Sequence, residues 1–298
     1  MPCRSFGKAI FIGGFYMNNH EPITDVRTLG TGKTIILGLQ HTFAMFGATV
    51  LVPILTGLPI ATTLLMAGVG TLLFHLLTKG KVPAFLGSSF AFLGGYAVVA
   101  PMLDDGTPNM EMLPYACGGV FCAGLVYLLL AALIKGFGAK RVMKFFPPVV
   151  TGPIIISIGL ILAPSAIDNC ATNWPIALIA LITVIVFNIW GRGMAKIVPI
   201  LIGVAVSYIA AIIMGEVDFS GIGEEAVIGL PDFILMKFDV SAIITIMPIA
   251  LATMMEHIGD ISAIGATTGK NYIAQPGLHR TLLGDGLATC LAAAVGAP

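Results

Sequence analysis

The chain has 298 residues, of which 57% are hydrophobic and only 10% are charged, and its mean hydropathy is +0.98. A soluble domain of this length could not bury so much apolar surface, so the composition indicates a polytopic α-helical membrane protein. Fifteen basic and fifteen acidic residues give a net charge of zero. This balance offers no electrostatic attraction for a nucleic-acid partner, and we expect none.

A membrane-spanning helix needs about 20 mostly apolar residues. The chain offers about nine such runs, which in order are 34–56, 61–78, 82–101, 113–134, 147–164, 175–190, 197–214, 241–264 and 281–297. They predict a cytoplasmic N-terminal tail (1–33), seven spans (34–214), an external loop (215–239) and two further spans (240–298). We expect the loop to lie at the membrane surface and not to form a domain.

The charges between the spans predict the orientation of the chain. If the N-terminus is cytoplasmic, fourteen of the fifteen basic residues fall on the inner side, and only Lys237 lies outside. The outer loops then carry ten acidic residues. This distribution satisfies the positive-inside rule and would be lost if one span were miscounted. It predicts a multi-pass protein of the cytoplasmic membrane, embedded in the lipid bilayer.

Two carboxylates interrupt the apolar run 243–266. Glu256 and Asp260 are four residues apart and therefore share one face of a helix. An ionised carboxylate at mid-membrane costs about 3 kcal/mol on insertion scales, so such groups usually line a pathway. We interpret the pair as a site that binds a polar substrate and carries a proton. The alternative is that a carboxylate pairs with a neighbouring helix for structural reasons alone.

The third span is expected to be a broken helix, because Pro, Gly and Ser recur along it. These residues are Pro83, Gly87, Ser88, Ser89, Gly94 and Gly95. Broken backbone at membrane depth is tolerated only where it is buried or lines a cavity, and its freed N–H and C=O groups can bind a flat polar ligand. Alternatively, the small residues serve only to let helices approach closely.

Three further polar side chains lie within spans. Gln40 and His41 are near the start of the first span, and Asp285 is in the ninth. A lone histidine in a membrane is as often a structural hydrogen-bonding group as a ligand contact, and both readings stay open for His41. For Asp285 we expect a role in helix pairing or in a proton network. No metal site and no cofactor is expected.

Two weak matches between the first and eighth spans and between the second and ninth suggest an internal duplication. Gln40-His41 matches Glu256-His257 at an offset of 216 residues, and Thr63-Leu64-Leu65 matches Thr281-Leu282-Leu283 at an offset of 218. Because seven spans form one unit, the copies are inverted, as is common in secondary transporters. The expected architecture is all-α with about 14 spans in a 7+7 inverted repeat, of which this chain holds about nine. A true nine-helix protein is the alternative.

Four segments resemble a known family. They are QHTFAMFGATVLVP (40–53), GKVPAFLGSSFAF (80–92), MMEHIGD (254–260) and PGLHRTLLGDG (276–286). They closely resemble the nucleobase–ascorbate transporters, also called the nucleobase:cation symporter-2 family, and are nearest to its bacterial uracil permeases. The resemblance covers about residues 33–298. It implies a 14-span fold with core and gate domains, a homodimer at full length, and extended segments in the third and tenth spans that meet at the substrate.

The resemblance also implies roles for individual residues. Glu256 matches the eighth-span carboxylate that hydrogen-bonds the base, and Phe90, next to Ser89, matches the third-span residue whose main chain contacts it. Ala48 matches the small first-span residue that lines the pocket, and His41 the histidine that orders the site. Asp260 departs from the uracil permeases, which often carry His there, whereas xanthine and urate members often carry Asp.

Taken together, these features predict a proton-coupled symporter, and not an enzyme, that takes up uracil across the cytoplasmic membrane. As a fragment without the tenth span, the 298-residue chain is expected to be inactive in transport. A xanthine or urate permease of the same family is the first alternative. An anion transporter of related fold ranks lower, because the acidic pair would repel its substrate. A membrane enzyme ranks low as well, because no HExxH or GxSxG motif occurs.

Overall fold

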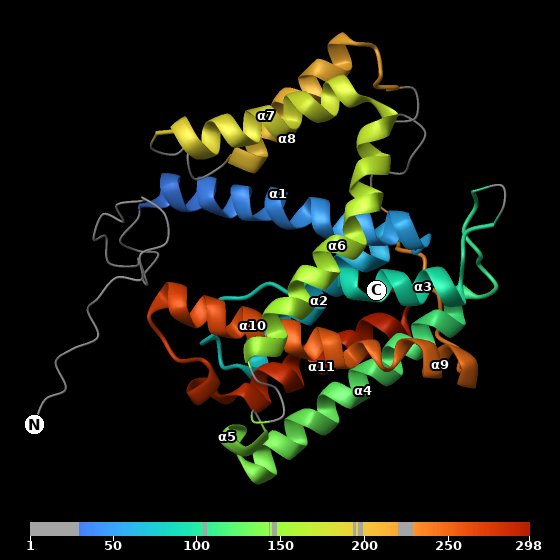
Figure 1. The fold of residues 1–298 in the computed structure, drawn as a ribbon, viewed down its shortest axis with the longest axis vertical. Coiled ribbons are helices and arrows are strands. Elements are labelled where there is room, and N and C mark those ends of the chain that lie inside the picture. Colours follow the sequence, from blue (N-terminus) through green and yellow to red (C-terminus); the bar gives the residue numbers. More distant parts are fainter. Residues whose placement is uncertain are drawn as a thin grey trace, which may run out of the picture.

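The computed structural model describes residues 30–103, 106–142, 144, 148–192, 195, 199–219 and 229–298. These residues form helices and connecting segments, with no strand among them (Figure 1). The helices are α1 (Thr31–Thr56), α2 (Ile60–Leu77), α3 (Leu93–Val99), α4 (Leu113–Phe137), α5 (Ala139–Val142), α6 (Pro148–Thr172), α7 (Trp174–Trp190), α8 (Pro199–Ile213), α9 (Val240–Ile246), α10 (Ile249–Thr268) and α11 (Leu278–Ala294).

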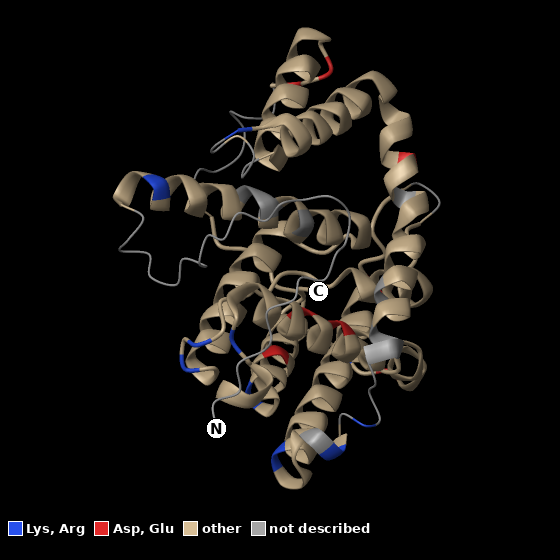
Figure 2. Cartoon of the chain, turned by 60° about the vertical axis from the view of Figure 1, so that its left-hand side comes forward, with Lys and Arg blue, Asp and Glu red and all other residues tan. Residues whose placement is uncertain are grey.

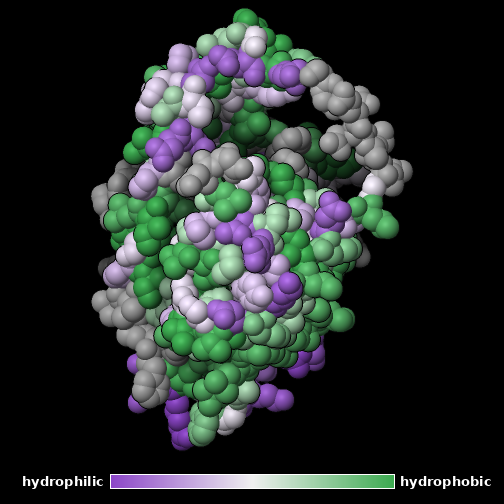
Figure 3. Space-filling model, turned by 90° about the vertical axis from the view of Figure 1, so that its right-hand side faces the viewer, coloured by the Kyte–Doolittle hydropathy of each residue, from purple (hydrophilic) through white to green (hydrophobic). Residues whose placement is uncertain are grey.

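Each predicted apolar run contains helical structure, although residues 83–89 of the third run are not helical. Within the described part of the chain, four helices are long and apolar enough to cross a membrane: Ile60–Leu77, Leu113–Phe137, Gly152–Thr172 and Val240–Thr268. Shorter apolar helices are Phe90–Val99, Trp174–Trp190 and Pro199–Ile213. Large apolar side chains such as Leu72, Leu129 and Ile213 are exposed, as expected where lipid is the solvent, and Figure 3 shows an outer face that is largely hydrophobic. The count of nine spans stays a prediction.

Local sequence determines where the helices begin and end. At the start of α7 the side chain of Asn173 accepts a hydrogen bond from Ile176 N, and at the start of α9 Asp239 accepts one from Ala242 N. Both side chains satisfy a backbone donor that the first turn of a helix leaves unpaired. Gly57 ends α1 in the left-handed conformation, with its N–H on the carbonyl of Pro53. Pro248 separates α9 from α10, so the predicted eighth span is two helices in line.

The core is built around α11, which packs between α4 and α2. Glycines allow the close approach: a Cβ added at Gly124 of α4 would lie 2.6 Å from Cys290 Sγ, and one at Gly286 of α11 would lie 2.6 Å from Tyr127 Cβ. On the other side, a Cβ at Gly284 would lie 2.9 Å from the Phe74 ring. Small residues drive helix association in membranes because lipid provides no hydrophobic force between helices.

A second group of helices lies apart from this core. α6 leads away from it, and α7 and α8 pack side by side at the top of Figure 1. Their contact is close at Gly203, where an added Cβ would lie 2.5 Å from a methyl group of Val184. None of the residues of α7 is buried. The candidate site residues of α10 and α11 therefore belong to the core and not to this pair.

The described part of the predicted external loop runs across the ends of the core helices. Residues 229–239 contain no helix. Ile234 N donates to Val295 O (3.1 Å), and Lys237 N donates to Pro114 O (2.9 Å). The hydroxyl of Thr62 on α2 donates to Asp232 O. This end of the loop connects α2, α4 and α11.

Candidate functional site

The third predicted span is broken, as its sequence indicates. Residues 83–89 have no regular structure, Phe90–Phe92 form a 3₁₀ turn, and α3 follows. The break is shorter than expected, because Gly94 and Gly95 lie inside α3. Gly95 instead permits close packing, since an added Cβ would lie 2.9 Å from both Ile246 and Ile249.

Side chains of neighbouring helices hold the extended segment. Thr71 Oγ1 of α2 accepts a hydrogen bond from Leu86 N (3.0 Å) and donates one to Leu86 O (3.3 Å), so it satisfies both backbone polar groups of Leu86. Ser88 Oγ donates to Thr49 O of α1 over 3.3 Å. In a helix these backbone groups would bond to one another. Without any hydrogen-bond partner inside a membrane, each group would be costly. The sequence did not identify this role for Thr71 or Thr49.

Glu256 and Asp260 lie one turn apart on α10. Glu256 is half-buried and Asp260 is exposed. α10 packs against the Phe90–Phe92 turn, so the helix that carries Glu256 lies beside the end of the extended segment. His257 and Asp260 lie on the same helix as Glu256, and His257 contacts Asp285 of α11, so three carboxylates and one imidazole lie in one neighbourhood. Figure 2 shows acidic residues in the middle of the core and basic residues at its ends.

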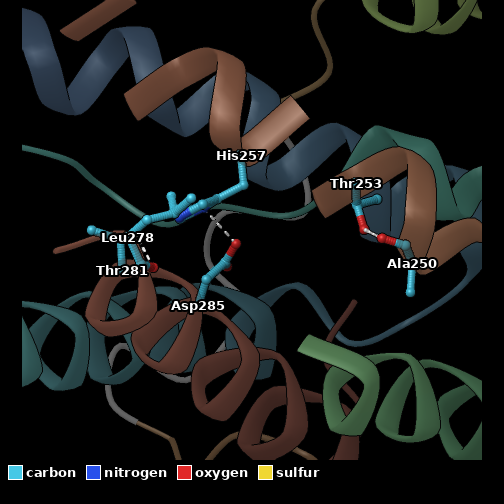
Figure 4. A network of polar contacts seen from close by, with 6 residues as sticks. All are labelled: Ala250, Thr253, His257, Leu278, Thr281 and Asp285. Atoms are coloured by element: carbon cyan, nitrogen blue, oxygen red, sulfur yellow. Dashed lines mark hydrogen bonds and ion pairs between the residues drawn. The ribbon is translucent and has the colours of Figure 1, made fainter. Parts of the chain in front are cut away.

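An ion pair joins α10 and α11 beside these carboxylates. His257 Nδ1 lies 2.8 Å from Asp285 Oδ2 (Figure 4). His257 is 8% exposed, and its ring meets the ring of Tyr127 edge to face with the centroids 6.4 Å apart. Its second nitrogen, Nε2, is buried without a hydrogen-bond partner among the described residues. The sequence had singled out Asp285 for a role in helix pairing or a proton network, but it did not identify His257 as its partner.

Asp285 also lines a small cavity that includes the extended segment. The cavity, of about 40 Å³, lies between α2, residues 86–88 and α11, and Ser88 and Thr63 are among its lining residues. Drug-sized ligands usually need roughly 300 Å³ or more, so this space suits water and not an organic substrate. It nevertheless places the His257–Asp285 pair next to the broken span.

The remaining predicted site residues lie on α1 and at the end of the break. His41 is exposed and meets the Phe85 ring edge to face at 6.0 Å. Gln40 is half-buried and has an interaction partner. Ser89 is extended, and it and Phe90 are half-buried at the start of the 3₁₀ turn. Ala48 belongs to α1, but its side chain lies outside the described residues.

Comparison with known proteins identifies the family. The Permease family matches residues 32–298, nearly the whole chain. The chain belongs to this family. A probable uracil permease of Haemophilus influenzae is 40% identical over 291 residues, which cover 95% of this chain and 68% of that protein. The uracil permease of Bacillus caldolyticus is 41% identical over 296 residues (94% and 66%), and the putative pyrimidine permease RutG of Escherichia coli is 37% identical over 274 residues (89% and 61%).

These matches confirm the resemblance to nucleobase–ascorbate transporters on the uracil permease side. The permease spans about two thirds of the length of the relatives that it matches. Its family consists of transporters, and its apolar helices make it a multi-pass membrane protein. The structure adds two interactions that the sequence did not predict. Thr71 bonds to the backbone of Leu86, and His257 contacts Asp285. Both join segments far apart in the chain.

Proposed function

We propose that this permease takes up uracil across the cytoplasmic membrane in symport with protons. The observation that carries the proposal is the 37–42% identity to relatives named uracil permease or pyrimidine permease over most of the chain. Identity of this extent preserves the fold and commonly the substrate class. The proposed orientation, with a cytoplasmic N-terminus, rests on the distribution of Lys and Arg between the spans.

Glu256 is proposed to hold the base. Uracil presents N–H donors next to carbonyl acceptors, and an ionised carboxylate can accept N–H bonds while backbone N–H groups near Ser89 and Phe90 donate to the carbonyls. The packing of α10 against the Phe90–Phe92 turn supports this arrangement. Ala48 is proposed to line the pocket, and His41 and Gln40 to order it from α1.

Proton coupling is proposed to depend on the three carboxylates Glu256, Asp260 and Asp285. Glu256 and Asp260 lie one turn apart on α10, and Asp285 contacts His257, the residue that follows Glu256. Like charges in one partly buried site repel, so a proton bound there lowers the electrostatic energy. In the proposed cycle a proton and uracil bind from outside, and the core helices then move against α6–α8. The proton and uracil are released inside.

The finer architecture is part of the same proposal. The nine apolar runs are proposed as the first nine spans of a 14-span, 7+7 inverted repeat that dimerises. The repeat rests on the two matches at offsets of 216 and 218 residues. The two copies would place the broken third span opposite a second broken span at the substrate.

A purine substrate is the second candidate, and Asp260 is the residue that favours it. Xanthine and urate transporters of the family often carry Asp at this position, where uracil permeases often carry His. Asp260 lies one turn after Glu256, on the same face of α10. A base larger than uracil would reach both side chains.

Competition for uptake separates the two substrates. The chain, joined to the C-terminal third of the Bacillus caldolyticus uracil permease, is produced in cells that lack their own uracil and xanthine transporters. We expect the cells to take up radiolabelled uracil. Excess unlabelled uracil should abolish this uptake, excess xanthine should leave it unchanged, and a protonophore should suppress it. Strong inhibition by excess xanthine, or no uptake of labelled uracil beside uptake of labelled xanthine, would contradict the uracil assignment. Insensitivity to the protonophore would contradict proton coupling.

A further inference from the structure

An apolar groove of about 550 Å³ lies between α4 and α10 and ends beside α5. Leu129 and Leu133 of α4 form one side, and Leu251 of α10 forms the other. These three side chains are 40–60% exposed, so the groove opens to the surroundings of the protein. Figure 3 shows hydrophobic side chains over much of one outer face, with hydrophilic groups in its upper part, near its centre and at the lower tip.

The length of the groove along α4 matches the thickness of one leaflet of a bilayer. Its lining residues on α4 run from Val126, near the middle of the helix, to Phe137 at its end. At 1.5 Å per residue this is about 17 Å along the axis, close to half of the roughly 30 Å hydrocarbon core. An elongated apolar molecule that entered from the end of α4 would therefore reach about the middle of the membrane.

Among the described residues that line the groove, one is charged, and it lies at the end where the headgroups of that leaflet would lie. Arg141 of α5 is exposed, and its side chain makes no ion pair with any described residue. Lys135 and Lys144 are exposed at the same end of the chain, where basic residues gather at the bottom of Figure 2. An amphiphile with an apolar tail and an anionic head would complement both parts of the groove.

We propose that this groove binds an anionic phospholipid of the leaflet at the basic end of α4. One acyl chain lies between α4 and α10, and the phosphate accepts hydrogen bonds from the guanidinium of Arg141. A guanidinium presents a planar fork of donors that matches phosphate oxygens, and juxtamembrane basic groups select anionic headgroups. The site is separate from the extended segment 83–89 and does not depend on the identity of the transported base.

The bound lipid would contact the helix that carries the candidate site. Met254 lines the groove and belongs to α10, two residues before Glu256. Occupancy of the groove therefore adds packing to α4 and α10 together, and the lipid stabilises the pair in the arrangement seen here. General solvation by lipid tails is the competing explanation, and it predicts no preference for the headgroup and no dependence on Arg141.

Native mass spectrometry in detergent distinguishes the two explanations, with the chain joined to the C-terminal third of the Bacillus caldolyticus uracil permease. The protein is titrated with phosphatidylglycerol, phosphatidylethanolamine and phosphatidylcholine that carry identical acyl chains. We expect phosphatidylglycerol to be retained in preference to the other two. Arg141→Gln should weaken its binding about fivefold, as expected for the loss of one basic group near an anionic headgroup.

Two further variants complete the test. Lys81→Gln removes an exposed basic residue beyond the end of α2, outside the groove, and should leave phosphatidylglycerol binding unchanged. Leu129→Trp places a large side chain in the groove and should weaken the binding of all three lipids, with helix content by circular dichroism unchanged. Equal retention of the three lipids, or equal binding by the Arg141→Gln and unsubstituted proteins, would overturn the proposal.

Discussion

His257 Nδ1 and Asp285 Oδ2 lie 2.8 Å apart and connect α10 to α11 inside the helical core. The contact also links the two parts of the candidate site, which are the carboxylates of α10 and the extended segment 83–89. His257 directly follows Glu256 on α10, and Asp285 shares a cavity with Ser88 of the broken span. The pair therefore fixes the helix that bears the candidate substrate-binding acid relative to the extended segment.

Loss of either partner of this pair should destabilise the core. Asp285→Ala leaves the imidazole of His257 buried without a partner, and His257→Ala leaves the carboxylate unpaired, each at a cost of about 1–3 kcal/mol. Thermal unfolding in detergent should show a lowered midpoint for both variants. The double variant should lose less than the two single losses combined. Strict additivity, or a loss as large in the exposed control Glu111→Ala, would contradict the coupling.

The contact between α4 and α11 requires glycine at position 124. Gly124→Ala would place a Cβ 2.6 Å from Cys290 Sγ and 3.1 Å from Gly286 O. Overpacking of this kind should lower the free energy of unfolding by about 1–3 kcal/mol. Gly136→Ala is the matched control on the same helix, because nothing lies within 4 Å of its added Cβ. The prediction is wrong if the two variants unfold at the same temperature.

Thr71 should stabilise the extended segment through its hydrogen bonds with the backbone N–H and C=O of Leu86. Thr71→Val keeps the shape of the side chain and removes both hydrogen bonds, so the half-buried N–H and C=O of Leu86 lose this partner at a cost of about 1–3 kcal/mol. Hydrogen–deuterium exchange should then increase in peptides that cover residues 84–89. Thr267→Val, whose hydroxyl bonds only to Ala263 O within α10, should leave that exchange unchanged.

The fold was largely predictable from apolar run length. Helices in a membrane must be apolar, and polar connections separate them, so α1, α2, α4, α7 and α8 begin and end near the predicted residues. α6 begins near its predicted start but ends at Thr172, eight residues beyond the predicted end at 164. Residue type also predicted a break in the third span. Its extent was not predictable, because Gly95 lowers helix propensity in isolation but is used here for packing on Ile246 and Ile249.

The candidate site was predictable as a set of residues and not as a set of contacts. Carboxylates inside apolar runs singled out Glu256, Asp260 and Asp285, because their insertion is costly. The partner of Asp285 depends on how α10 and α11 pack, and the partner of Leu86 depends on how α2 faces the extended segment. Such long-range contacts leave no trace in spacing along the chain. The roles of Ser89 and Phe90 in binding a base therefore stay predictions.

Equilibrium binding of radiolabelled uracil to the Glu256→Gln variant tests the central claim most directly. The protein is again joined to the C-terminal third of the Bacillus caldolyticus relative. The control is Glu111→Gln, which replaces an exposed carboxylate far from Glu256 in the sequence. Loss of a charge-assisted hydrogen bond should weaken uracil binding at least about tenfold in Glu256→Gln, whereas the control should bind as tightly as the unsubstituted protein. Equal uracil affinity in all three proteins would contradict the assignment of Glu256 to the base.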